Sequence, residues 1–199
     1  MSHGHDATVS TRPLAPSRSV MEVPTGRLAV WWVLASEIVI FGGLLGAYIM
    51  QRIGHPGWAN QSVHTNTLAG SINTFILLSS SLSAVLAHQA AERGDGRRAA
   101  RLLRLTALGG ASFLVVKSIE WTFEIREGFT ITSNLFWSFY YTAAGLHALH
   151  VIAGMVIMLI VAAGAARNRN LHRVENIGIY WHFVDIVCIF LFPLLYIAK

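Results

Sequence analysis

Five long apolar stretches dominate this 199-residue chain, and each is long enough to cross a lipid bilayer. They run over about residues 28–50, 68–91, 104–125, 135–166 and 177–197. Only helices and closed barrels satisfy all backbone hydrogen bonds inside a membrane, and a spanning helix needs roughly 20 apolar residues. The sequence therefore predicts an all-α integral membrane bundle of five transmembrane helices.

The composition leaves little chain for anything outside this bundle. The sequence is 54% hydrophobic and only 13% charged, whereas soluble domains carry about 25% charged residues. We expect one transmembrane domain over residues 27–199, preceded by a mobile cytoplasmic tail over residues 1–26 that is rich in Pro, Ser and Arg. The formal charge of +5 comes from short loops rather than one basic face, so no nucleic acid partner is expected.

Basic residues in short loops predict the orientation in the membrane, because the cytoplasmic side carries an excess of Lys and Arg. The N-terminal segment and the loops at 92–104 and 167–176 hold eleven Arg residues, against three basic residues in the other loops and the C-terminus. The N-terminus is therefore predicted to be cytoplasmic and the C-terminus outside, as an odd number of spans requires. We expect a multi-pass membrane protein.

Several residues predict how the helices pack. Gly42 and Gly46 form a small-xxx-small pair on the first span, opposite the face that carries Glu37, so this helix is expected to be packed on both sides. Pro193 is expected to loosen the end of the last span. An aromatic belt at the membrane interfaces is predicted from Trp31, Trp32, Trp137, Tyr140, Tyr180 and Trp181.

Ionisable side chains inside the spans are the main indication of function, because they are costly in a membrane and usually face a protein interior or a cavity. They are Glu37, Lys117, Glu120, Glu124, His147, His150, His182 and Asp185. Lys117 and Glu120 lie three positions apart and can pair on one helix face, either as a structural ion pair or as part of an ion pathway. Glu37 lies roughly 14 Å into its span, with no opposite charge nearby in sequence. It is expected to be protonated or bonded to a partner helix.

Two further pairs could ligate a metal or join a hydrogen-bonded network. His147 with His150, and His182 with Asp185, each share one helix face. Together with the glutamates they resemble the ligand inventory of a metal-binding helix bundle. They lie at different depths, however, so a network between helices is the favoured interpretation and no metal site is predicted. Cys188, the single cysteine, excludes an internal disulfide and a multi-thiolate site.

Five motifs, in order, resemble subunit III of the haem-copper oxidases. They are "ASEIVIFGGLLGAYI" (35–49), "NTFILLSSSLSAVLAH" (73–88), "KSIEWTFEIREGFTITSN" (117–134), "YYTAAGLHALHVIAG" (140–154) and "YWHFVDIVCIFLFPLLY" (180–196). The resemblance covers about residues 27–199 and is closest to the five-helix bacterial form, which is known in quinol oxidases and some cytochrome c oxidases. It leaves cytochrome c and quinol open as the electron donor.

The resemblance implies an accessory role in oxygen reduction. Subunit III binds no haem or copper itself, so these cofactors are expected in partner subunits. The implied partners are the catalytic subunit I, subunit II and membrane phospholipid, and the implied role is to stabilise subunit I and support proton uptake. Within the resemblance, Glu37, Lys117, Glu120, His147, His150, His182 and Asp185 form a buried polar network that is structural or proton-related, and none is catalytic.

One departure and three alternatives remain at this point. Cys188 stands where the family usually has Trp, and the smaller side chain would leave space for a lipid, a helix or another partner. The "IREGFTITSN" and "FPLLY" segments are also similar to subunit III-like proteins that accompany nitric oxide reductases. A stand-alone ion transporter would need inverted repeats, which the chain does not show. A metal-binding membrane protein would need its ligands at one depth.

Overall fold

The computed structural model describes residues 25–55 and 65–197, and every regular element in these ranges is helical. The elements are α1 (Thr25–Gly54), α3 (Thr67–Glu92), α4 (Gly96–Arg126), α5 (Leu135–Ala165), α6 (His172–Phe192) and the π-helical turn η1 (Pro193–Ile197). Five helices are long and apolar enough to cross a membrane, which confirms the predicted fold class. Residues 25 and 26 of the predicted tail begin α1, and the rest of the tail lies outside the described residues.

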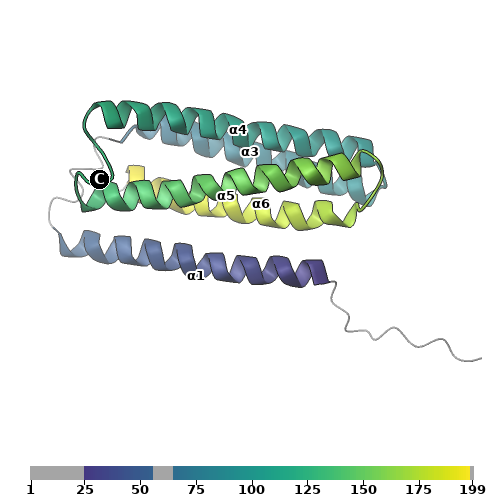
Figure 1. Ribbon diagram of the computed structural model, residues 1–199, viewed down its shortest axis with the longest axis horizontal. Coiled ribbons are helices and arrows are strands. Elements are labelled where there is room, and N and C mark those ends of the chain that lie inside the picture. The colour runs from purple at the N-terminus through teal and green to yellow at the C-terminus, as the bar shows by residue number, and fades with distance from the viewer. Residues whose placement is uncertain (1–24, 56–64, 198–199) are drawn as a thin grey trace, which may run out of the picture.

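The helices form a four-helix group with one helix beside it (Figure 1). α3, α4, α5 and α6 lie side by side and alternate in direction, while α1 runs along one flank of the group. α1 packs mainly on α6 and less extensively on α5. The ends of α1, α4 and α6 therefore lie at the same end of the bundle as the starts of α3 and α5.

Three helices follow a residue whose side chain caps their first turn. The side-chain oxygens of Asn66, Asp95 and Asn134 accept hydrogen bonds from the backbone N–H three residues further on, over 3.1, 2.9 and 3.1 Å. With its cap at Asp95, α4 begins well before residue 104. The Arg-rich segment 92–104, predicted to be a loop, is therefore mostly helix, and the turn before α4 is short.

The turn between α5 and α6 approaches the first residue of α4 too closely for a side chain there. A Cβ atom at Gly96 would lie 2.1 Å from the Ala165 carbonyl oxygen. Instead, the Gly96 N–H donates to the Asn168 side-chain oxygen over 3.0 Å. Asn168 has a φ of 52°, in the left-handed region that Asn tolerates better than most residues. This contact joins the two helix connections at one end of the bundle.

Trp181 of α6 fills the centre of the four-helix group. Its side chain is fully buried, and its ring lies against α4 and α5 where Gly110 and Gly154 leave room. Its indole N–H donates to the Ser80 hydroxyl of α3 over 3.1 Å. The aromatic belt prediction is therefore wrong for Trp181, and also for Trp137 and Tyr140, which are fully buried. Trp181 fits inside the bundle beside two glycines, whereas Trp137 and Tyr140 pack against each other and Phe136.

Among residues 25–55 and 65–197, the first helix is packed on one side only. Leu34, Phe41 and Tyr48 are buried against the bundle, and the Tyr48 hydroxyl donates to the Leu194 carbonyl over 2.9 Å. A Cβ atom at Gly42 or Gly46 would meet no described residue within 4 Å. The expectation that α1 is packed on both sides is thus wrong for the described part of the chain, and its small-residue face stays open.

We expect Trp181→Ala to lower the free energy of unfolding by about 3–5 kcal/mol, because it leaves a large cavity where four helices meet. The melting temperature of the purified protein in mild detergent measures this loss. Trp32→Ala is the matched control, since Trp32 is 72% exposed on α1. Equal melting temperatures for the two variants would contradict the central packing role of Trp181.

Candidate functional site

A group of polar side chains, all but one of them buried, lies at the end of the bundle where α4 and α6 end and α5 begins. We call it the Lys117 cluster, and it consists of Lys117, Glu120, Glu124, Tyr140, Tyr141 and Tyr196. The three α4 residues share one face because spacings of three and four follow the helix period. Tyr196 reaches the cluster from the π-helical turn that begins at Pro193, as expected from the effect of proline on a helix end.

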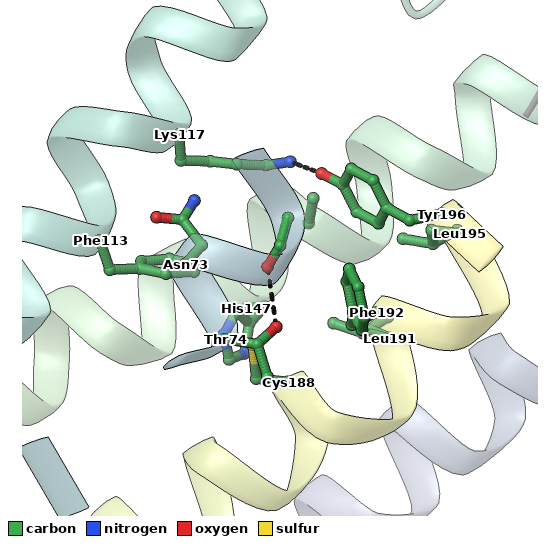
Figure 2. A pocket seen from close by; sticks show the side chains of 12 residues that line it. Asn73, Thr74, Phe113, Lys117, His147, Cys188, Leu191, Phe192, Leu195 and Tyr196 are labelled. Atoms are coloured by element: carbon green, nitrogen blue, oxygen red, sulfur yellow. Dashed lines mark hydrogen bonds between the residues drawn. The ribbon is translucent and has the colours of Figure 1, made fainter. Parts of the chain in front are cut away.

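Lys117 uses all three of its N–H donors inside the cluster. Its ammonium donates to Glu120 Oε2 over 3.1 Å, to the Tyr140 hydroxyl over 2.8 Å and to the Tyr196 hydroxyl. Figure 2 shows the last of these bonds at one side of a pocket. The same ammonium lies 4.6 Å from the ring centre of Tyr140 and 5.1 Å from that of Tyr196. These contacts compensate for the lost hydration of the charge.

The two carboxylates of the cluster are not equally supplied with hydrogen bonds. Glu120 Oε1 accepts from the Tyr196 hydroxyl over 2.7 Å and lies 3.1 Å from the Tyr140 hydroxyl. Glu124 Oε1 lies 2.9 Å from the same Tyr140 hydroxyl. Because a phenol carries one hydrogen, Tyr140 can donate to only one of the two carboxylates at a time. The cluster therefore has alternative hydrogen-bond arrangements around Tyr140.

A second polar contact joins α1 to α5. Glu37 Oε2 lies 2.9 Å from His150 Nε2, and both side chains are largely buried. The other ring nitrogen of His150 lies 2.7 Å from the Leu146 carbonyl oxygen. A carbonyl only accepts hydrogen bonds, so His150 Nδ1 carries a hydrogen. Glu37 and His150 are within ion-pair distance of each other, although the contact does not have the geometry of a hydrogen bond.

Hydroxyl groups of α3 form three further hydrogen bonds between helices. The Ser81 hydroxyl lies 2.5 Å from His182 Nδ1 of α6. The Ser83 hydroxyl lies 2.7 Å from that of Thr106 on α4. With the Ser80–Trp181 bond, these contacts connect α3 to both of its neighbours without a charged group.

Two predicted network members, His147 and Asp185, are almost fully buried with few polar contacts. Neither ring nitrogen of His147 has a hydrogen-bond partner in residues 25–55 and 65–197, whereas the Asp185 carboxyl group lies near the Ser81 hydroxyl without a hydrogen bond of good geometry. His147 does make an edge-to-face contact with Phe113, with ring centres 5.4 Å apart. Asp185 does not bond to His182, although the two share a helix face.

The seven residues singled out from the sequence thus lie in separate places. Lys117 and Glu120 meet in one cluster, Glu37 and His150 in another contact, and His182 bonds to α3. Sequence reasoning missed the role of Tyr140 and Tyr196 in the Lys117 cluster. By helical spacing Tyr140 shares a face with His147, and Tyr196 shares one with Asp185, which was the signal available for finding them.

The described part of the chain does not contain a ligand set of the kind that a metal-binding helix bundle requires. Within residues 25–55 and 65–197, no group of three or more His, Cys, Asp or Glu side chains is placed to hold a metal ion. Cys188 is buried and makes a weak contact of 3.9 Å with the Thr74 hydroxyl.

These observations define a class of protein: a multi-pass membrane protein whose helices are joined by buried polar contacts. A family model described as cytochrome c oxidase subunit III matches residues 20–199, which is most of the chain. The chain therefore belongs to the cytochrome c oxidase subunit III family, and the resemblance of its five motifs to subunit III of the haem-copper oxidases is confirmed.

Individual relatives agree with this family over most of their length. A cytochrome c oxidase subunit 3 of Corynebacterium diphtheriae is 35% identical over 173 residues, covering 83% of this chain and 84% of the relative. The protein of the same name in Bacillus subtilis is 31% identical over 195 residues, covering 96% of this chain and 94% of the relative. A third, from Thermostichus vulcanus, is 34% identical over 169 residues, covering 82% and 83%.

We expect Lys117→Met to destabilise the chain by about 3–5 kcal/mol, because it leaves the Glu120 carboxylate buried without its cation. The double variant Lys117→Met/Glu120→Gln should recover much of this loss, since both charges are then removed. Arg104→Met, an exposed change on the same helix, is the control. Melting temperatures of the purified protein give the comparison, and a double variant weaker than the single one would contradict the buried ion pair.

Proposed function

We propose that this chain is the non-catalytic subunit III of a bacterial terminal oxidase, in which it stabilises the catalytic subunit I and supports proton uptake during oxygen reduction. The observation that carries the proposal is the family match over residues 20–199, together with the buried polar contacts between helices. Haem and copper are assigned to the partner subunits I and II. The names of the relatives support cytochrome c rather than quinol as the electron donor.

The open face of α1 supports its role as a contact to a partner subunit. Gly42 and Gly46 have no neighbour in the described part of the chain, and a pair of small residues lets another membrane helix approach closely. Large apolar side chains such as Val39 and Met50 are also exposed on α1. We assign this face to subunit I or to lipid that lies between the two subunits.

A groove beside α1 supports the proposed binding of phospholipid. It lies between α1, α5 and α6 and has a volume of about 390 Å³. Its walls are apolar, including Val33 and Ile157, and Arg173 lies at its edge near the start of α6. An acyl chain fits such walls, and a phosphate group fits the guanidinium. With the N-terminus in the cytoplasm, as the loop charges predict, this groove would lie in the cytoplasmic half of the membrane.

The Glu37–His150 contact supports a role in handling protons. It brings two ionisable side chains within 2.9 Å of each other, and it lies between the peripheral helix α1 and the bundle. A contact of this kind can pass a proton or fix the position of α1. Glu37 is therefore the residue of this chain that we assign to proton supply.

We expect Glu37→Gln to leave the haem content of the oxidase unchanged but to slow turnover, or to weaken retention of this chain, because an amide cannot accept and release a proton. Oxygen consumption of the purified complex across a range of pH measures the effect. Glu127→Gln, an exposed change at the end of α4, is the control. Turnover, pH dependence and stability all equal to those of the unmodified complex would refute the role of Glu37.

The stabilising role is tested by removing the chain from the assembly. An oxidase prepared without this chain should keep its haem spectrum and its initial rate with reduced cytochrome c, and then lose activity progressively during turnover. Loss of the haem spectrum itself would instead indicate a role in cofactor assembly. Activity that persists as long as in the complete complex would contradict the proposal.

A further inference from the structure

A small, partly open cavity lies between α3, α4, α5 and α6, next to the Lys117 cluster. The space open to the centre of a water molecule is about 40 Å³. Figure 2 shows Lys117 and Tyr196 at one side of this cavity and Thr74 and Cys188 at the other. Its wall combines apolar groups such as Phe113 with the polar side chains of Asn73, Thr74, His147 and Cys188.

Two polar side chains in the cavity wall are buried without hydrogen-bond partners. Asn73 and His147 are each 3% exposed. Asn73 Oδ1 and both ring nitrogens of His147 have no partner among the described residues. Leaving such groups unpaired in an apolar interior costs about 1–3 kcal/mol each. Because most buried polar groups in native proteins are satisfied by protein or by ordered water, these atoms indicate a polar occupant.

The neighbouring cluster does not satisfy these atoms. The three Lys117 donors are already directed to Glu120, Tyr140 and Tyr196. The Thr74 hydroxyl donates its hydrogen to the Gly70 carbonyl over 2.9 Å, so toward the cavity it can only accept. An occupant must therefore both donate, to Asn73 Oδ1 and Thr74, and exchange hydrogen bonds with His147. Water has these properties and is small enough for the space.

We propose that this cavity is a binding site for ordered water, which bridges Asn73 of α3 to His147 of α5. A water molecule needs a centre volume of at least about 10–15 Å³ and two to four polar partners, so the cavity has room for about two or three. The bridge connects two helices that share no direct polar contact at this point. It also explains why a buried asparagine and a buried histidine are tolerated beside Phe113.

A density map of the intact oxidase, at a resolution that shows water, tests the site directly. We expect at least one peak within hydrogen-bonding distance, roughly 2.7–3.2 Å, of both Asn73 Oδ1 or Nδ2 and a ring nitrogen of His147. A well-ordered cavity wall with no peak between these side chains would overturn the proposal. A direct hydrogen bond between Asn73 and His147 would overturn it as well.

Apolar substitutions distinguish a hydrated cavity from a dry one, because they lower the melting temperature in the first case and raise it in the second. If water bridges the two side chains, Asn73→Leu and His147→Phe each remove one end of the bridge. Each should then lower the melting temperature of the chain in the intact oxidase by roughly 2–6 °C. The double variant should lose less than the sum of the two, because it leaves neither end unpaired.

In a dry cavity each single substitution removes an unpaired polar group and should raise the melting temperature. Ser79→Leu, on the exposed face of the same helix as Asn73, is the control for a polar-to-apolar change and should cause no drop. Single variants that are neutral or stabilised would overturn the proposal. Additive losses in the double variant would do so too, since they would show that Asn73 and His147 act independently.

Discussion

The cost of keeping the Lys117 ammonium inside the membrane governs the arrangement at one end of this bundle. An unpaired charge there is far too costly, so its three donors must all find acceptors. They find Glu120 one turn along α4, Tyr140 on α5 and Tyr196 beyond α6. Three helices are thereby fixed relative to one another, with Tyr196 supplied by the π-helical turn Pro193–Ile197.

The rest of the bundle follows a different principle, in which small residues and hydroxyl groups let the helices approach. Trp181 fits between Gly110 and Gly154 and bonds to Ser80. In a membrane the hydrophobic effect does not drive helices together, because lipid tails are as apolar as the side chains. Close packing and short polar contacts must therefore stabilise the association of the helices. Among the helices of the described residues, only α1 lacks such packing over most of its surface, which agrees with a helix whose remaining contacts are made by other subunits or lipid.

Hydropathy predicted the five spans because a membrane helix requires about 20 apolar residues, and that requirement is local in sequence. The ion pair of Lys117 and Glu120 was also predictable, since a spacing of three fixes it on one helix. The tyrosines of that cluster were not, because the rotation of α5 and α6 about their axes depends on packing. For the same reason Trp181 was wrongly placed in an interfacial belt. The sequence did not indicate which residue contacts Glu37. The structure shows that it is His150, because α1 lies against α5.

The most direct test of the account is to purify the tagged chain from its own membranes in mild detergent, and to record the optical spectrum and the mass spectrum of what accompanies it. The account predicts copurifying haem and a large catalytic oxidase subunit, with oxygen consumption supported by reduced cytochrome c. A colourless chain that purifies alone from membranes containing the oxidase would contradict it. So would the catalytic subunit of a nitric oxide reductase as its only partner.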